Sequence, residues 1–181
     1  MATDVITLIT SDHRKVEALF ERLKTNKGDR AADVAELAAL LTAHARAEED
    51  RVYDSVSDKK AHHGVEEHKE AEVLLDTLKK TDPASPEFDG RLAELIEAVT
   101  HHVEEEESEI LPALAKSMSK EGLERLGKAF KEREEEELLA LRGHAAAPTK
   151  EELYEQAKEQ DLPGRSQMTK EELAKALGES K

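Results

Sequence analysis

The chain contains no cysteine. This absence excludes disulfide bonds and metal sites built from thiolates. Aromatic residues make up only 3% of the sequence, and glycine and proline number 8 and 5. The rest is rich in alanine, leucine, glutamate and lysine, which favour helices, so the composition predicts an all-α protein.

Long apolar segments are also missing. No run approaches the roughly 20 residues that a membrane-spanning helix needs. The first ten residues, MATDVITLIT, lack a basic flank followed by a long apolar core, so they are not typical of a signal peptide. The net charge of -15 argues against a large binding surface for DNA or anionic membranes. We therefore expect a cytoplasmic protein.

Four segments show apolar residues with a period near 3.6, which is typical of amphipathic helices. They span about residues 4–24, 31–56, 64–80 and 88–118. Because the connections between them are short, we expect an antiparallel four-helix bundle. Pro112 lies inside the last segment and should kink or break it. A charged segment at 121–141 predicts an additional helix lying across the bundle.

Each of the four predicted helices carries a histidine where its pattern calls for a core residue: His13, His44, His68 and His102. A single histidine on an apolar face is more often a hydrogen-bonded core residue than a ligand. Two glutamates occupy inward positions as well, four residues after a histidine, so that His44 and Glu48 share a face, as do His102 and Glu106. Unpaired buried carboxylates are costly, and the set as a whole therefore indicates a metal site.

The ligand types narrow the choice of ion. Imidazole together with carboxylate suits Fe, Mn, Zn or Cu, whereas Ca and Mg prefer sites made of oxygen alone. Six protein ligands are more than one tetrahedral zinc ion takes. Two ions with bridging carboxylates fit the number better, and spacing alone does not choose between iron and manganese.

The remaining histidines and glutamates near these positions have a plainer interpretation. Glu104, Glu105 and Glu107 are expected to be solvated or at the rim of the site, as charge runs usually are. The histidines at positions 62, 63 and 144 are also expected in water. His101 lies about 100° around the helix from His102, so it should flank the site.

The motifs SDHRKVEALF, HARAEED, EEHKEAEVLLDTL and HVEEEESEILP together resemble the hemerythrin-like, or HHE cation-binding, domain family over about residues 1–120. The resemblance implies a four-helix bundle holding a non-heme di-iron centre bridged by an oxo or hydroxo group and two carboxylates. Members of this family carry or sense O2 or take part in nitric oxide, iron or peroxide responses, and some bacterial members show catalase-like activity.

One feature departs from hemerythrins proper, which supply five histidines and two carboxylates with a His-x-x-x-His pair on the third helix. Here Glu72 stands four residues after His68 and is a candidate seventh ligand. Tyr53, close behind the motif of the second helix, is a weaker candidate. The changed ligand set favours oxidase- or peroxidase-type chemistry over reversible O2 carriage.

The chain changes character near its C-terminus, which predicts three parts: a bundle with its trailing helix at 1–143, a linker at 144–148 and a small helical module at 149–181. In the module, Thr149 with Glu152 and Thr169 with Glu172 form capping boxes around a Pro163-Gly164 turn. The module resembles SAP-like and Rho N-terminal-like domains, some of which bind nucleic acid. From Pro148 onward six Lys and Arg oppose eight Asp and Glu, a balance of -2, so any nucleic-acid binding should be weak and salt-sensitive.

Together these features predict a non-heme protein with two iron ions that reacts with a small oxidant, H2O2, O2 or NO. Catalase-like decomposition of peroxide in oxidative-stress defence is the leading hypothesis. The alternative is a module that senses O2, NO or iron and passes its state to a partner through the C-terminal tail.

Overall fold

The computed structural model describes residues 3–25, 28–146, 150–159, 162, 164–165 and 168–177. Within them the chain is helical and contains no strand, which confirms the all-α prediction. The helices are α1 (Val5–Thr25), α2 (Arg30–Arg51), α3 (Asp58–Lys79), α4 (Pro86–Glu105), α5 (Leu111–Ser117), α6 (Lys120–Ala146), α7 (Lys150–Glu159) and α8 (Lys170–Ala176). A 3-10 turn, η1 (Tyr53–Ser55), follows α2, and a π turn, η2 (Glu106–Ile110), joins α4 to α5.

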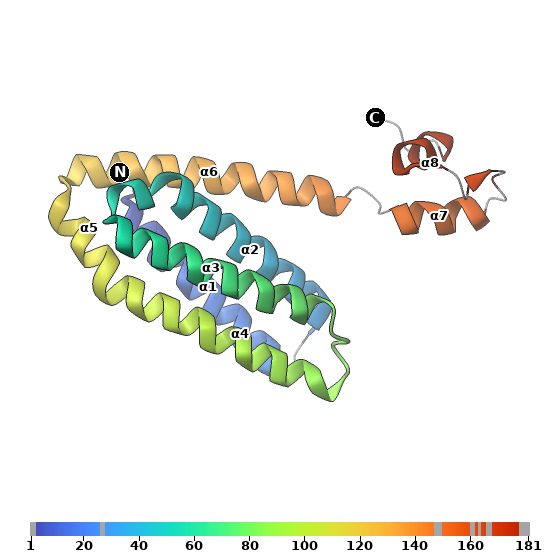
Figure 1. Ribbon diagram of the computed structural model, residues 1–181, viewed down its shortest axis with the longest axis horizontal. Coiled ribbons are helices and arrows are strands. Elements are labelled where there is room, and N and C mark those ends of the chain that lie inside the picture. Colours follow the sequence, from blue (N-terminus) through green and yellow to red (C-terminus); the bar gives the residue numbers. More distant parts are fainter. Residues whose placement is uncertain are drawn as a thin grey trace. The chain divides into compact units, whose positions relative to one another are not determined.

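Helices α1 to α4 lie side by side with alternating directions and form the predicted antiparallel four-helix bundle (Figure 1). Local sequence signals set the starts of its helices. Asp29 caps α2 by accepting hydrogen bonds from the backbone N–H groups of Ala31 and Ala32. Pro86 stands in the first turn of α4, where a missing N–H costs nothing.

The apolar core of the bundle consists of two clusters with a polar layer between them. On α1, for example, Val16 belongs to the first cluster and Ile9 to the second, and the buried His13 lies between them in the sequence. The first cluster also contains Leu37, Leu78 and Leu95, which are fully buried. A buried polar layer costs free energy unless its groups are paired with one another or with an ion.

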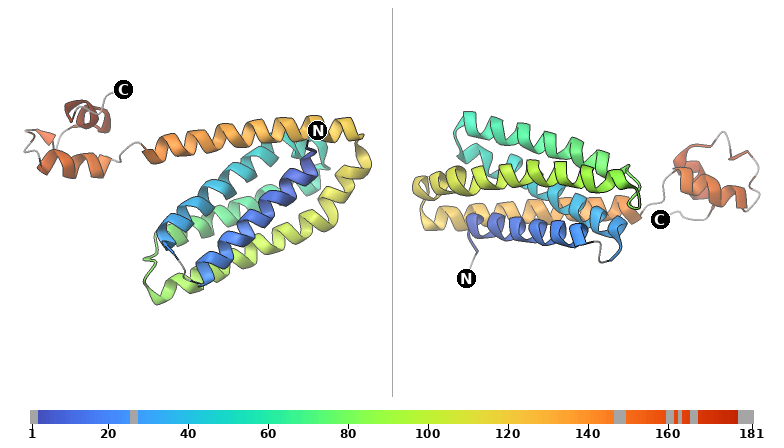
Figure 2. Two further views of the ribbon diagram at one scale, coloured as in Figure 1. Left: turned by 180° about the vertical axis from the view of Figure 1, so that it is seen from behind. Right: turned by 90° about the horizontal axis from the view of Figure 1, so that it is seen from below.

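Helix α6 lies alongside the bundle, next to α1 and α2 (Figure 2). Its Phe130 is fully buried in the second cluster. A Cβ atom at Gly127 would stand 2.6 Å from the carbonyl oxygen of Thr3, so α6 packs directly on the backbone before α1. The Arg133 side chain also donates to Asp50 of α2 at 2.6 Å. These contacts agree with the prediction of an additional helix across the bundle.

The predicted segment 88–118 is one helix interrupted by the π turn. The N–H of Leu111 donates to the carbonyl oxygen of Glu106, five residues back instead of four. Pro112 explains the interruption, since its ring would clash with the carbonyl of Ser108 in a regular helix and it has no N–H to donate. The prediction of a break at Pro112 is therefore correct, and the break begins before the proline.

Other boundaries differ from the predicted ones. Helix α3 begins six residues earlier than predicted, at Asp58, so His62 and His63 are helical. Helix α2 ends at Arg51 and gives way to η1. Helix α6 runs to Ala146, so residues 144–146 of the predicted linker are helical.

The chain divides into two compact units at residues 138 and 139. The second unit has its own small core of Leu153, Ala157 and Leu173. The predicted capping box of Thr169 and Glu172 is present at the start of α8. Thr149 and Pro163 lie outside the described residues. None of the described helices is sufficiently long and apolar to cross a membrane.

Candidate metal centre

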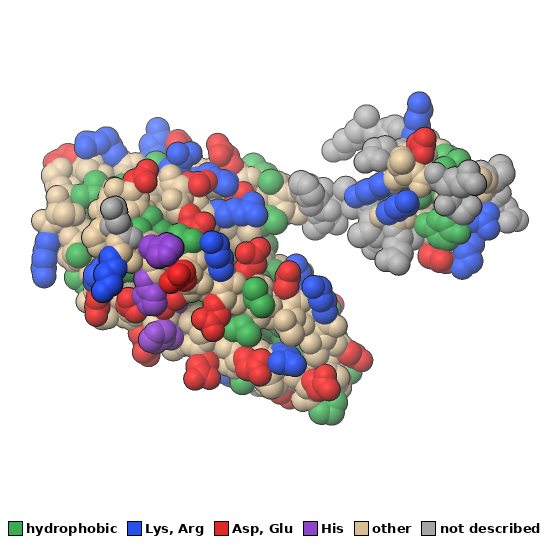
Figure 3. Space-filling model, in the orientation of Figure 1, with side chains coloured by type: hydrophobic (Ala, Val, Ile, Leu, Met, Phe, Trp, Pro, Cys, Tyr) green, Lys and Arg blue, Asp and Glu red, His purple; other side chains and the backbone are tan. Residues whose placement is uncertain are grey.

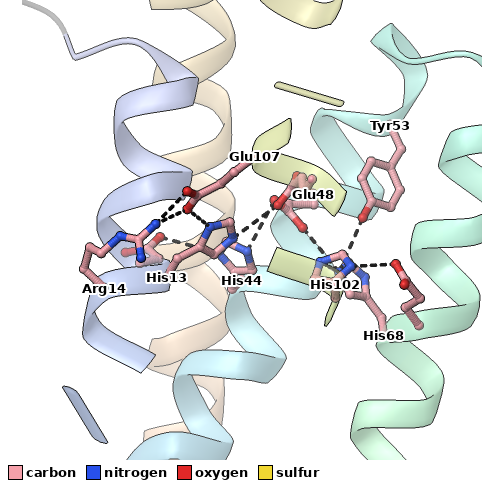
Figure 4. Close-up of polar contacts among 11 residues, drawn as sticks. His13, Arg14, His44, Glu48, Tyr53, His68, His102 and Glu107 are labelled. Carbon is pink, nitrogen blue, oxygen red and sulfur yellow. Dashed lines mark hydrogen bonds and ion pairs between the residues drawn. The ribbon is translucent and has the colours of Figure 1, made fainter. Parts of the chain in front are cut away.

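Six of the side chains predicted as ligands meet at one level of the bundle (Figure 4). All four bundle helices contribute, and the sixth residue, Glu106, opens the π turn η2. The two glutamates are completely buried, and the four histidine side chains are at most 10% exposed. The six residues are His13, His44, Glu48, His68, His102 and Glu106.

The inward-facing atoms fall into two groups that share Glu48. In the first, His13 Nε2 lies 3.2 Å from Glu106 Oε2, and His44 Nε2 lies 3.3 Å from Glu48 Oε1. In the second, His68 Nε2 lies 3.3 Å from Glu48 Oε2 and 3.2 Å from His102 Nε2. The two oxygens of Glu48 therefore point to different groups.

Buried atoms without hydrogen-bond partners show that this site fits metal ions. Both oxygens of Glu48 and of Glu106, and the Nε2 atoms of His13 and His44, are buried with no hydrogen bond. Two ligands that each stand about 2.1 Å from one ion are separated by about 3.0–3.4 Å at common coordination angles. The observed separations fall in this range, and imidazole with carboxylate is a donor set for transition metals.

A carboxylate stands beside the outer nitrogen, Nδ1, of each histidine. His13 Nδ1 donates to Glu107 at 2.8 Å, His68 Nδ1 to Glu49 at 3.0 Å and His102 Nδ1 to Glu67 at 2.9 Å. His44 Nδ1 lies 3.6 Å from Asp12. Since a carboxylate only accepts, the hydrogen bonds of His13, His68 and His102 keep the proton on Nδ1 and leave Nε2 free to bind an ion.

Sequence reasoning did not assign roles to these four outer carboxylates. A signal was present, because each is the direct sequence neighbour of a predicted ligand: Asp12, Glu49, Glu67 and Glu107. Glu107 does lie toward the rim, as expected. However, it also forms an ion pair with Arg14 and holds His13, which makes it part of the site (Figure 4).

The electrostatics of the metal-free site show strong mutual influence among its members. Burial alone would raise the pKa of Glu48, but the neighbouring His44 and His68 outweigh burial and hold it well below its usual range. Burial and the negative charge of Glu48 raise the pKa of Glu106. Burial lowers the pKa of His68, but Glu48 and Glu49 outweigh it and raise that pKa to about 9. Without an ion, the positive charge beside Glu48 is therefore supplied by protonated imidazole, such as that of His68.

The two candidates for a seventh ligand differ in position. Glu72 is exposed on α3 and belongs to neither group, so the structure does not bring it to the other six. Tyr53 is buried, and its Oη lies 3.4 Å from His68 Nε2 with the two rings stacked. Burial and the charges of Glu48 and Glu106 raise its pKa, so the phenol keeps its proton.

A cavity of about 160 Å³ reaches the centre from between the helices. It touches all four histidines of the centre. Its other walls are mainly apolar, with Val16, Leu41, Leu75, Val99 and Val103, and Glu72 lines it as well. The volume suits molecules of a few atoms.

Comparisons with known proteins agree with this geometry. The model of the hemerythrin HHE cation-binding domain matches residues 4–114. A protein named DNA nickase from Nostoc sp. (strain PCC 7120) is 32% identical over 130 residues, which cover 68% of this chain and 37% of that protein. A crystal structure of a hemerythrin HHE cation-binding domain-containing protein from Mycobacterium kansasii has the same fold, with a TM-score of 0.69 and 23% identity over 76% of this chain and 89% of that one.

Proposed function

Because this chain belongs to the hemerythrin HHE cation-binding domain family, we propose that its buried centre holds two iron ions and decomposes hydrogen peroxide. The observation that carries the proposal is the position of Glu48. Its two oxygens face two different groups of ligand atoms, as a carboxylate bridging two ions requires. The first ion would be held by His13, His44, Glu48 and Glu106, and the second by Glu48, His68 and His102.

Iron held by these residues would supply the redox chemistry of the net reaction 2 H2O2 → O2 + 2 H2O, in which one peroxide is oxidised and the other reduced. The chain contributes selection, orientation and protons. The mainly apolar walls of the cavity leave room for a small molecule beside the four histidines. Tyr53 Oη, which keeps its proton, directs a hydrogen-bond donor toward the second group of ligands.

Metal analysis with an optical spectrum is the first test. Protein grown with iron should contain about two iron ions per chain and show charge-transfer bands, and the purified protein should evolve O2 from peroxide. His44→Ala should lose iron and activity together. His62→Ala is the matched control, because His62 is exposed and belongs to neither group. Absence of bound transition metal would overturn the proposal, and iron-loaded protein inert to peroxide would remove its catalase part.

A second candidate function is sensing of O2, NO or iron. The separate C-terminal unit with its own core favours it, because such a unit can pass on the state of the centre. In that case O2 or NO would cause a stoichiometric spectral change without turnover. Equal protease sensitivity of residues 139–181 in oxidised and reduced protein would contradict signalling through the tail.

DNA cleavage is not part of the proposal. The matched region spans little more than a third of the relative named DNA nickase. The chain also carries a net charge of -15, which opposes contact with phosphates.

A further inference from the structure

A second set of histidines and glutamates lies outside the buried centre, on the surface where α3 meets α4. His63 and Glu67 stand four residues apart on α3, and His101 and Glu105 stand four apart on α4. This is the spacing of the buried pairs His44–Glu48 and His102–Glu106. The α4 pair precedes its buried counterpart by one residue, and so it faces about 100° further toward solvent.

Three of the four side chains of this outer cluster converge, and His101 stands beside them. His63 Nε2 lies 3.4 Å from Glu105 Oε2 and 3.7 Å from Glu67 Oε1. His101 Nε2 lies 3.8 Å from the same oxygen of Glu67. Ligand atoms of His63, Glu67 and Glu105 all lie within 4.8 Å of one another. Small rotations of these side chains would bring the atoms to the separation of about 3.0–3.4 Å that one ion imposes.

One atom of the outer cluster lacks a hydrogen-bond partner, as expected of a metal ligand in the absence of its ion. Glu67 Oε1 is buried and has no hydrogen bond, although the Glu67 side chain is 12% exposed as a whole. The side chains of His63 and His101 are 48% and 72% exposed, so an ion can arrive from solvent. Figure 3 shows histidine side chains gathered beside acidic ones on this face.

We propose that His63, Glu67, His101 and Glu105 form a third binding site, open to solvent, for a divalent transition-metal ion. Two carboxylates balance the charge of such an ion, and two imidazoles favour Zn²⁺, Co²⁺ or Fe²⁺ over Mg²⁺ or Ca²⁺. The outer site communicates with the buried centre through one residue, because Glu67 Oε2 accepts the hydrogen bond of His102 Nδ1. An ion bound at the outer site would be coordinated by the same carboxylate, that of Glu67, which orients His102.

Titration of the full chain with Co²⁺ tests the site, after the buried centre has been filled with iron. One further equivalent should bind and produce the visible bands of cobalt with nitrogen and oxygen ligands. His63→Ala should weaken the affinity for this Co²⁺ ion by about tenfold or more. The loss of a direct ligand lowers metal affinity at least as much as the loss of a residue that hydrogen-bonds to a ligand. His62→Ala is the matched control, because the neighbouring His62 is also exposed, at 77% against 48% for His63, and pairs with Glu66 outside the outer cluster.

Binding of Co²⁺ at the outer site should also shift the absorption bands of the iron centre in the unaltered protein. This shift should be absent in His63→Ala. Absence of a further equivalent, or equal binding by the unaltered protein and His63→Ala, would overturn the site. An unchanged iron spectrum would overturn the link through Glu67. Because binding is counted and peroxide activity is not, an inactive buried centre does not alter either result.

Discussion

At the scale of single residues, each histidine of the centre is used at both ring nitrogens. Nε2 faces the buried ligand groups, and Nδ1 faces a carboxylate outside them, such as Glu107 for His13. Fixing one nitrogen fixes the direction of the other. The outer carboxylates therefore decide how well the site is prepared for an ion, although none of them belongs to either buried ligand group.

Replacing Glu107 by glutamine should weaken metal binding by the first group about 10- to 100-fold, because His13 loses its anionic partner. Competition with a chelator of known affinity measures the change. Glu104→Gln removes the same charge from an exposed position in the same acidic run and should leave the affinity unchanged. Equal losses in the two variants would assign the effect to net charge and not to the contact with His13.

The raised pKa of His68 predicts how the stability of the metal-free protein depends on pH. A histidine whose pKa rises on folding, here from 6.5 to about 9, stabilises the folded chain fully below pH 6.5. This contribution is lost as the pH rises through 9. The melting temperature of metal-free protein should therefore fall over this interval, and less so in His68→Gln. His62→Gln, altered at an exposed position, should keep the full fall.

At the scale of helices, the sequence predicts well which of these side chains share a buried face, because their spacing is local. An α-helix repeats every 3.6 residues, so His102 and Glu106 must share a face wherever the helix packs. Glu72 shows the limit of this rule. Each step of four residues turns by about 40°, and the apolar stripe of α3 passes through the partly buried Ala71 and the buried Leu75 and leaves Glu72 outside.

Contacts between helices were harder to predict. The approach of Tyr53 to His68 depends on the end of α2 at Arg51 and on the turn η1, neither of which the periodicity marks. The partners of Nδ1 depend on side-chain rotamers and on how adjacent helices are rotated. These are tertiary properties, and a single sequence carries only indirect signals of them.

Gly64 offers a test of this packing between α3 and η1. A Cβ atom there would stand 2.4 Å from Tyr53 Oη and 2.8 Å from its Cζ. Since the ring is buried, Gly64→Ala should displace it and cost about 1–3 kcal/mol in the free energy of unfolding. Gly90→Ala, with nothing within 4 Å, should instead gain about 0.5–1 kcal/mol. Urea unfolding measures both, and a gain at both positions would contradict the close contact.

At the scale of the whole molecule, the candidate metal centre and the small core of the C-terminal part belong to different compact units. The first unit ends at residue 138, and every candidate ligand lies within it. The second unit has a core of its own around Leu153 and Leu173. Metal binding should thus depend on the first unit alone.

Removal of residues 150–181 should therefore leave the number of bound metal ions and their affinity unchanged. The melting temperature of the bundle should stay within the error of the measurement, because no bundle core residue is removed. Metal analysis and calorimetry of the shortened chain measure both quantities. A loss of bound metal would show that the C-terminal unit supports the centre.

The π turn η2 also limits which insertions and deletions this segment can tolerate during evolution. It accommodates one residue more than a regular turn in a helix that otherwise runs from Pro86 to Ser117. Deleting one codon here would restore a regular turn, in which the ring of Pro112 clashes with the carbonyl four residues before it and no N–H is available for the regular hydrogen bond. The extra residue, Pro112 and the buried glutamate at the start of the turn should thus be inherited together. A one-residue gap in a related sequence at this point would mark a lineage whose centre is built on a different backbone.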